Sequence, residues 1–297
     1  MPNLRDIKRK IEAVKKIGQI TKAMNMVAAA KLRGAQERVE QFRPYASKFK
    51  AVITELAASK AVDPSQFALM QQREVKKVEI ILITADRGLC GAFNANLINR
   101  ADKFIKEQRA KGRDVSMICV GKKGAQYFRK FDFLRKEYVD IMGRVEIFNA
   151  REVAREAMRA FIDEEVDETY LIYGYFINVV RQVPKVEKLL PISIEEEEEG
   201  GEQVEEGGPM GAYIYEPSAE EIFQEILPLY VNTRVFAGML ETAVSEQAAR
   251  MTAMDNANRA CSDMVHSLTL LFNKTRQAAI TKELMDIVGG AEALKKG

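Results

Sequence analysis

The sequence predicts an α/β domain inserted between two long terminal helices that pair as an antiparallel coiled coil. Helical periodicity runs from residue 1 to about 58 and again from 218 to about 294, whereas the residues between them alternate short apolar runs with helical stretches. At about 1.5 Å of rise per residue, the terminal helices would be roughly 85 and 110 Å long. Such lengths exceed the width of a globular domain, so we expect the two helices to pack along each other or along a partner.

The first helix carries the spacing of a coiled-coil seam. Its first apolar residues alternate spacings of three and four: Leu4, Ile7, Ile11 and Val14. After a shift in register, we expect the seam to continue through Ile20, Met24 and Val27. Pro44 predicts a local break or kink in the helix, and Asp63-Pro64 predicts its end.

The middle segment predicts a largely parallel, Rossmann-like sheet. Strands are expected at 78–84 and 115–120, each followed by a glycine-containing turn and a helix. The expected helices cover 92–110, a stretch that ends near 131, and 150–165. Two further strands, 169–180 and 186–194, are expected to pair as an antiparallel edge with a turn near Pro184. Alternation of strands and helices is typical of an α/β unit.

The C-terminal helix carries two apolar stripes with coiled-coil spacing. The first is Cys261, Met264, Leu268 and Leu271, and the second is Ile280, Leu284, Ile287, Ala291 and Leu294. Pro228 predicts a break or kink near the start of this helix. We therefore expect an N-terminal coiled-coil helix (1–60), an inserted α/β domain (75–195), an acidic, glycine-rich flexible loop (196–211) and a C-terminal coiled-coil helix (212–297).

The amino-acid composition indicates no particular substrate or ligand for the chain. Its 297 residues carry a net charge of only +2, and the three cysteines, Cys90, Cys119 and Cys261, form no CxxC pair, which fits a reducing compartment. The apolar runs are too short to span a bilayer. The basic N-terminus lacks the apolar stretch of a secretory signal and the serines of a transit peptide, so we expect it to belong to the mature protein.

Two turns sit where phosphate-binding loops are found. The segments Asp86-Arg-Gly-Leu-Cys-Gly91 and Gly121-Lys-Lys-Gly124 both follow a strand and precede a helix. Neither matches GxGxxG or GxxxxGK[ST], so we interpret both as tight turns between strand and helix. A nucleotide-binding α/β module with a coiled-coil interaction arm remains the alternative hypothesis.

Catalytic and metal-binding interpretations find little support in the residue pattern. Cys90 would lie at a helix N-terminus, but no base is near it in the sequence, and the single histidine, His266, lies deep in the C-terminal helix. Nothing clusters around His266 as metal ligands would. We therefore expect no catalytic residue, no metal and no cofactor.

The N-terminal helix has a basic face that allows three interpretations. Through Arg33 it carries nine Lys or Arg residues against Asp6 and Glu12. This face could be merely solvated, could bind an acidic protein surface, or could lie on anionic membrane or nucleic acid. No aromatic residue occurs in 1–41, which argues against base stacking.

Four segments together resemble the gamma subunit of rotary F-type ATP synthases. They are Gln19-Ile-Thr-Lys-Ala-Met-Asn-Met-Val-Ala-Ala-Ala-Lys-Leu32, Asp86-Arg-Gly-Leu-Cys-Gly91, Ser245-Glu-Gln-Ala-Ala-Arg-Met-Thr-Ala-Met254 and Asn273-Lys-Thr-Arg-Gln-Ala-Ala-Ile-Thr-Lys-Glu-Leu284. The resemblance covers essentially the whole chain in order. It implies a non-catalytic central-stalk rotor that transmits torque between a membrane ring of c subunits and a ring of three alpha and three beta subunits.

The resemblance also implies particular contact residues. Positions facing the alpha/beta ring would be Lys22, Met24, Arg250, Arg276, Gln277, Thr281 and Glu283. Positions at the foot, facing the c ring and the epsilon subunit, would be Tyr213, Tyr215 and Glu216. Small residues would supply a smooth bearing surface: Ala28, Ala29, Ala30, Ala278 and Ala279.

The same resemblance implies where the chain works. It would lie peripherally at the cytoplasmic face of a bacterial inner membrane, would meet the membrane only through the complex, and would bind no nucleic acid. The sequence has no inserted cysteine pair of the kind that switches chloroplast relatives, so we expect no thiol regulation.

Overall fold

The computed structural model describes residues 3–58, 66–193 and 218–296. The predicted acidic loop (196–211) and the predicted foot residues Tyr213, Tyr215 and Glu216 lie outside the described residues. The chain divides into two compact units. The coil unit comprises Met1–Ala30 with Arg250–Gly297, and the head unit comprises Lys31–Ala249.

Two long helices contribute to both units. Helix α1 spans Leu4–Ala58 and helix α5 spans Ala219–Lys296. Ser218 caps the start of α5, because its hydroxyl accepts the amide hydrogen of Glu221 at 3.2 Å. A break at Pro44 or Pro228, one of the two predicted alternatives, is wrong, since both prolines lie inside continuous helices. Packing of the residues on either side keeps the helix despite one lost hydrogen bond. The kink stays a prediction.

The burial pattern of α1 corrects the predicted seam. The least exposed positions continue the three-four spacing without any shift: Leu4, Ile7, Ile11, Val14, Gly18, Thr21, Asn25, Ala28, Leu32, Ala35, Val39, Phe42, Ala46, Phe49 and Ile53. Ile20 and Val27, which were expected on the seam, are 58% and 56% exposed. The seam passes instead through small and polar residues, which a search for apolar spacing overlooks.

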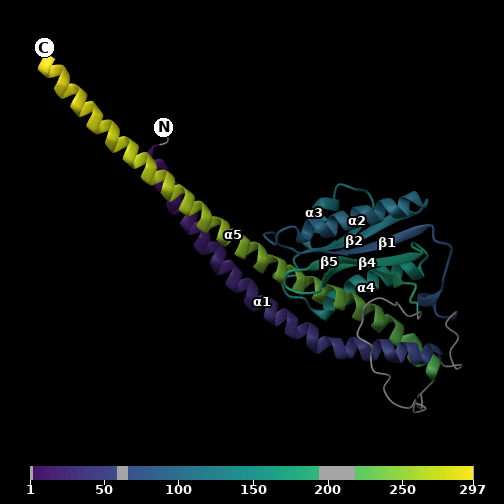
Figure 1. The fold of residues 1–297 in the computed structure, drawn as a ribbon. Helices are drawn as coiled ribbons and strands as arrows, with labels where there is room; N and C mark the ends of the chain where they lie inside the picture. The colour runs from purple at the N-terminus through teal and green to yellow at the C-terminus, as the bar shows by residue number, and fades with distance from the viewer. Residues whose placement is uncertain (1–2, 59–65, 194–217, 297) are drawn as a thin grey trace. The chain divides into compact units, whose positions relative to one another are not determined.

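The head unit contains a five-stranded sheet of order β3-β2-β1-β4-β5 (Figure 1). The strands are β1 (Lys77–Ile83), β2 (Asp114–Val120), β3 (Leu134–Tyr138), β4 (Glu168–Phe176) and β5 (Gln182–Leu190). The first four run parallel, and β5 pairs antiparallel with β4 at one edge. The predicted α/β class and antiparallel edge are confirmed, and this strand order is that of a Rossmann-like domain.

Details of the sheet differ from the prediction. Strand β3 was not predicted, because its sequence Leu-Arg-Lys-Glu-Tyr is mostly charged. The turn between β4 and β5 lies at 178–181, where the Arg181 amide donates to Asn178 Oδ1 at 2.8 Å. Pro184, which was expected near that turn, lies inside β5, opposite Gly174. Proline is tolerated there because β5 is the outermost strand.

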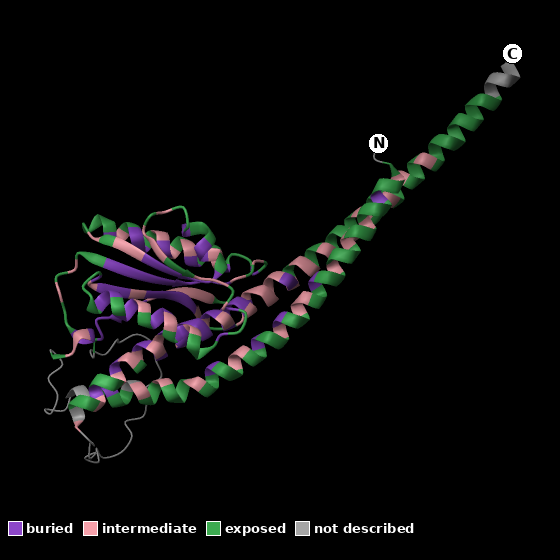
Figure 2. Cartoon of the chain, turned by 180° about the vertical axis from the view of Figure 1, so that it is seen from behind, coloured by how far each residue is buried: buried purple, intermediate pink, exposed green. Residues whose placement is uncertain are grey.

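Helices cover both faces of the sheet. Helices α2 (Phe93–Ala110) and α3 (Lys122–Phe128) pack on the face that carries Val78, Ile80 and Leu82. Helix α4 (Ile147–Ile162) and the head-unit part of α5 lie on the opposite face (Figure 1). A short 3-10 helix, η2 (Ala68–Met70), precedes β1. The purple strands in Figure 2 show that the head-unit core is centred on the sheet.

Candidate partner-contact surface

Helix α5 is anchored to the sheet of the head unit by polar side chains. Strand β4 pairs with β1 only as far as Ile172. Two residues further on, the Gly174 amide donates to Thr242 Oγ1 at 3.1 Å, and the Gly174 carbonyl accepts from Ser245 Oγ at 3.0 Å. The Phe176 amide donates to Glu241 Oε2 at 3.2 Å. Side chains of α5 therefore satisfy the peptide groups that a neighbouring strand would otherwise satisfy.

A buried ion pair adds a second anchor between α5 and the sheet. Arg234 of α5 bonds Glu187 of β5, and the Tyr173 hydroxyl donates to the other Glu187 oxygen at 3.0 Å. Burial lowers the pKa of Arg234, but the Glu187 carboxylate, together with Tyr230 and Tyr173, raises the pKa above its ordinary value. Removal of Arg234 would leave the buried Glu187 carboxylate without a compensating charge.

Helix α1 also packs on α5 within the head unit. The Phe42 and Phe236 rings meet edge to face, with centroids 4.9 Å apart, a favourable aromatic geometry. Arg43 lies 3.8 Å from Glu241, and Arg38 donates to the Val145 carbonyl. These contacts place α1, α5 and the loop before α4 in one packed body.

The side chain of Asp86, the first residue of the first predicted turn, bonds the surrounding backbone. Asp86 accepts three backbone amide hydrogens, from Lys122 at 2.9 Å, Asp140 at 3.0 Å and Met142 at 2.8 Å. The Lys122 amide belongs to the start of α3, the helix that follows the second predicted turn. Asp86 thus occupies the anion position at that helix and ties the two turns together, which supports the interpretation of both as structural turns.

The second predicted turn, 121–124, packs tightly against Thr84 at the end of β1. Gly121 has φ +94°, and a Cβ there would lie 2.0 Å from the Thr84 carbonyl oxygen. The Gly124 amide donates to Thr84 Oγ1 at 2.9 Å. Glycine is required at 121 because β1 and the start of α3 touch at this point.

The crevice at the ends of β1 and β4 is filled by side chains. In a Rossmann-like sheet this is the usual ligand position, because the strand order reverses there. A Cβ on Gly174 would lie 2.7 Å from the Phe93 ring and 3.4 Å from Ser245 Cβ. Phe93 comes from α2 and Ser245 from α5, so these two helices occupy the space that a nucleotide would need.

Cys90 and His266 have ordinary structural surroundings. Cys90 is buried at the start of α2, and the Asn94 amide nitrogen lies 3.1 Å from its sulfur. His266 is exposed on α5. Within 3–58, 66–193 and 218–296, no three His, Cys, Asp or Glu side chains group as metal ligands would.

In the coil unit, α1 and α5 run antiparallel. The Asn25 side chain donates to the Met251 carbonyl at 2.8 Å, and a Cβ on Gly18 would lie 3.4 Å from Cys261 Cβ. The less exposed positions of α5 follow seam spacing: Met254, Asn258, Cys261, Val265, Leu268, Phe272, Thr275 and Ala279. The predicted seam residues Met264 and Leu271 are instead exposed, at 53% and 42%.

Most of the predicted alpha/beta contact positions have accessible side chains. Those exposed are Lys22, Arg276, Gln277, Thr281 and Glu283, and those half-buried are Met24 and Arg250. The basic residues of the N-terminal face are exposed as well. The predicted bearing is partly wrong, because Ala28 is a buried seam residue at 1% exposure. These positions lie on both helices of the coil unit, so the structure does not gather them into a single pocket.

The sequence prediction missed a stretch of exposed apolar side chains near the end of α5. Ile280, Leu284 and Ile287 were expected on a self-pairing seam, but they are 50%, 56% and 68% exposed. Met285 and Val288 beside them are also exposed, and every residue from 280 to 291 is exposed (green in Figure 2). The same residue spacing is found in a seam within one chain and in a surface that another chain covers. The sequence alone therefore predicted the wrong partner for these residues.

Comparison with known proteins assigns the family. A family model described as ATP synthase matches residues 3–294. The ATP synthase gamma chain of Desulfotalea psychrophila is 52% identical over 99% of this chain and 100% of its own length, and that of Nitratidesulfovibrio vulgaris (strain Hildenborough) is 51% identical over the same shares. The chain belongs to the ATP synthase gamma chain family. The resemblance predicted from four segments is therefore confirmed along the chain.

Solved structures agree with this gamma chain fold. A chain from the central stalk and c ring of the Tetrahymena thermophila mitochondrial ATP synthase is 26% identical, with a TM-score of 0.59 over 80% of this chain and 99% of its own. A chain of the Euglena gracilis mitochondrial ATP synthase has a TM-score of 0.63 over 98% and 94% of the two chains at 21% identity, which supports the fold alone. In the described part of this gamma chain, no helix combines the length and hydropathy needed to cross a membrane.

Proposed function

We propose that this chain is the central-stalk rotor subunit of a proton-translocating F-type ATP synthase. It transmits torque between a membrane ring of c subunits and a ring of three alpha and three beta subunits, and it catalyses no reaction itself. Residues 1–60 and 212–297 serve as the shaft, 75–195 as the inserted domain, and 196–211 as an acidic loop. Membership of the gamma chain family links the chain to this complex.

The exposed apolar end of α5 is the single observation that carries the proposal. Five large apolar side chains within 280–288 are each at least half exposed. Exposed apolar stretches of this kind mark surfaces that another chain covers. A helix end that packs on nothing in its own chain suits a shaft tip enclosed by a ring of partner subunits.

The anchors of the head unit support the mechanical part of the proposal. Torque passes through a joint only if the joint resists shear. The Gly174 peptide held by Thr242 and Ser245, and the buried Arg234–Glu187 pair, tie α5 to the sheet by directional bonds. Turning α5 against the sheet would break these bonds, so the sheet and helix move together.

A nucleotide-binding function is disfavoured by the geometry already described. Asp86 occupies the anion position at the start of α3, and Phe93 fills the crevice beside Gly174. Catalysis and nucleotide binding are therefore assigned to the partner subunits. Partners also include an epsilon subunit, and the chain meets the cytoplasmic face of a bacterial inner membrane peripherally, through the complex.

The test uses a charge placed on the shaft in the assembled complex. Met24 is half-buried, and we propose that it faces an acidic lever loop on beta. In Met24→Lys the added cation attracts that loop too strongly at one angle, so ATP-driven proton pumping should fall severalfold while ATP hydrolysis persists. Proton pumping is measured in membrane vesicles as the pH gradient formed per ATP hydrolysed.

A matched variant controls for the charge itself. Met26 lies two residues away on another face of α1 and is 60% exposed. Met26→Lys adds the same charge and should leave the coupling ratio near its wild-type value. Equal loss of coupling in both variants would show that the contact position is wrongly assigned, and wild-type coupling in Met24→Lys would reject the lever contact.

A further inference from the structure

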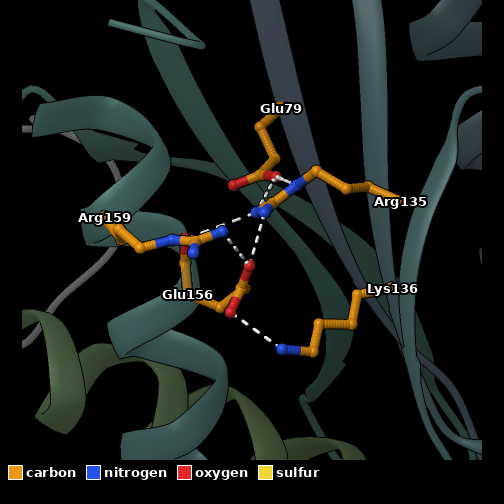
Figure 3. A network of polar contacts seen from close by, with 5 residues as sticks. All are labelled: Glu79, Arg135, Lys136, Glu156 and Arg159. Atoms are coloured by element: carbon orange, nitrogen blue, oxygen red, sulfur yellow. Dashed lines mark hydrogen bonds and ion pairs between the residues drawn. The ribbon is translucent and has the colours of Figure 1, made fainter. Parts of the chain in front are cut away.

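A carboxylate lies at the centre of the sheet, where apolar residues are expected. Glu79 is in the middle of β1 and is completely buried. Its Oε1 accepts hydrogen bonds from Arg135 Nε at 2.9 Å and Nη2 at 2.6 Å. Arg135 comes from β3, two strands away. Figure 3 shows that these bonds involve one oxygen of Glu79, while the other carries no contact to the residues drawn.

Glu79 belongs to a network whose other members reach the surface. Arg135 also bonds Glu156 Oε1 on α4 at 2.6 Å, and Lys136 and Arg159 bond Glu156 at 2.8 and 2.9 Å (Figure 3). Glu165, in the turn after α4, adds a further negative charge that acts on Glu79. The charged groups that act on Glu79 are thus Arg135 from β3, Glu156 from α4 and Glu165, whereas Lys136 and Arg159 contact Glu156.

Three buried side-chain oxygens on neighbouring strands have no hydrogen-bond partner among the described residues. They are Glu79 Oε2, Ser116 Oγ and Thr169 Oγ1. Ser116 on β2 and Thr169 on β4 are the direct register partners of Glu79 on the two neighbouring parallel strands. In-register residues of adjacent strands project from the same face of the sheet, about 4.8 Å apart. The three residues with unpartnered oxygens therefore form one row across three strands, on one face of the sheet.

One water molecule would satisfy this row. Buried polar atoms are rarely left unpaired, and a buried water typically makes two to four hydrogen bonds to such atoms. A water can donate to the Glu79 carboxylate and still accept from a hydroxyl of Ser116 or Thr169. A metal ion is a poor alternative, because the Arg135 guanidinium already lies against the same carboxylate.

We propose that Glu79, Ser116 and Thr169 form a buried binding site for one water molecule, through which the Glu79 carboxyl group exchanges a proton with solvent. The proton comes from solvent and leaves to solvent through the bound water. Glu79 keeps its Arg135 contact through Oε1 in both states, while Oε2 carries the proton. The site lies in the head unit and is independent of the rotor assignment.

The electrostatic surroundings of Glu79 agree with this geometry. The pKa of Glu79 is raised from 4.5 to about 7, and burial is the largest cause of the rise. The charge and hydrogen bonds of Arg135 lower the pKa, and repulsion from Glu156 and Glu165 adds to the rise. The folded chain thus binds the proton more tightly than the unfolded chain, so the stabilisation is complete below about pH 4.5 and is lost as the pH rises to about 7.

The first experiment titrates Glu79 directly. Carboxyl carbons of glutamate are followed by ¹³C NMR in the full chain, and the Glu79 signal is assigned by its loss in Glu79→Gln. The expected midpoint lies near pH 7. Thr169→Val, which removes the hydroxyl but keeps the shape, should raise the midpoint further, because the charged carboxylate loses water-mediated support. A wild-type midpoint at or below pH 4.5 would overturn the proposal.

A conservative variant and a crystal structure complete the test. Thr169→Ser keeps the hydroxyl and should keep the wild-type midpoint. This variant remains informative if Thr169→Val fails to fold. A crystal structure of the full chain should show one water within hydrogen-bond distance of Glu79 Oε2 and of at least one of the two hydroxyls. A dry site, or a direct bond between Glu79 Oε2 and either hydroxyl, would contradict the water site.

Stability gives an independent measure. The unfolding equilibrium constants of the wild type and Glu79→Gln are compared by urea denaturation between pH 4.5 and 9. The wild type should lose stability relative to the variant by a factor that approaches tenfold per pH unit between about 4.5 and 7, and then levels off. A ratio that stays constant across this range would refute proton binding at Glu79.

Discussion

The two ends of helix α5 have the same secondary structure in opposite environments. Between 219 and 254 the helix is buried at every turn, and its side chains bond the peptide groups of β4. Between 280 and 291 every residue is exposed. The first stretch is constrained by the fold of its own chain, whereas the second is free to be constrained by partner chains. Substitutions in the two stretches should therefore affect different measurements.

The largest effect is expected from a glycine in the packed head unit. In Gly121→Ala the new Cβ would lie 2.0 Å from the Thr84 carbonyl oxygen, at φ +94°. The strained backbone and the forced movement of β1 should together cost about 3 kcal/mol or more of unfolding free energy. Urea denaturation measures this cost, and a loss below about 1 kcal/mol would show that the contact between β1 and α3 is loose.

A smaller loss is expected from the hydroxyls that anchor α5 to β4. Thr242→Val and Ser245→Ala leave the buried Gly174 amide and carbonyl unpaired, at about 1–3 kcal/mol each. Because both hydroxyls bond the backbone of one residue, Gly174, the double variant is expected to deviate from additivity. The measurement is again the free energy of unfolding.

The coil unit offers matched controls for this pair. Ser262 and Thr269 are exposed on α5 and bond only carbonyls of their own helix, at 3.2 and 2.7 Å. Ser262→Ala and Thr269→Val should change the unfolding free energy by less than about 0.5 kcal/mol. Equal losses at all four positions would remove the contrast between the two stretches of α5.

Next comes a change in activity with little change in stability. Arg276 and Gln277 are exposed on α5, and we propose that they bond the beta ring. Arg276→Ala combined with Gln277→Leu should lower ATPase turnover of the assembled complex severalfold and leave the stability of the chain unchanged. Lys274→Ala removes an exposed charge three residues from Gln277 and is the control. Unchanged turnover in the double variant would exclude the contact.

The smallest expected effect is a gain in the stability of helix α5. Gly289 lies inside α5, and a Cβ there would have no atom within 4 Å. Gly289→Ala should stabilise this part of the helix by about 1 kcal/mol, because alanine has the higher helix propensity. Amide hydrogen exchange around residue 289 should slow by roughly fivefold. Faster exchange would mean that the exposed stretch makes contacts that the added methyl disturbs.

The seam of α1 shows what the sequence could predict. Leu4, Ile7, Ile11 and Val14 reveal it because all four are apolar. Gly18, Thr21 and Asn25 continue it in the structure, but no hydrophobic pattern distinguishes them from surface residues. Residue spacing therefore predicted the helix and its pairing, whereas the register beyond residue 14 depended on side chains whose burial is imposed by the opposite helix.

The sheet and the contact surface show the same limit. The apolar strands β1 and β2 were predicted, but β3 was not, because three of its five residues are charged and Arg135 is paired by side chains of other elements, Glu79 and Glu156. The partner-contact residues came from the resemblance to a family and not from their chemistry. Ile280, Leu284 and Ile287 were predicted to pair within the chain, because spacing alone does not reveal which surface an apolar stripe meets.

The proline at the rim of the sheet has a consequence for the newly made subunit. Pro184 lies in β5, the outermost strand, and has no N–H to offer an incoming strand. Its neighbour Lys185 and the nearby Lys188 place positive charge on the same strand. Proline and lysine on an outer strand discourage the stacking of sheets from separate molecules. A chain that waits for its assembly partners is thereby protected from polymerising with copies of itself.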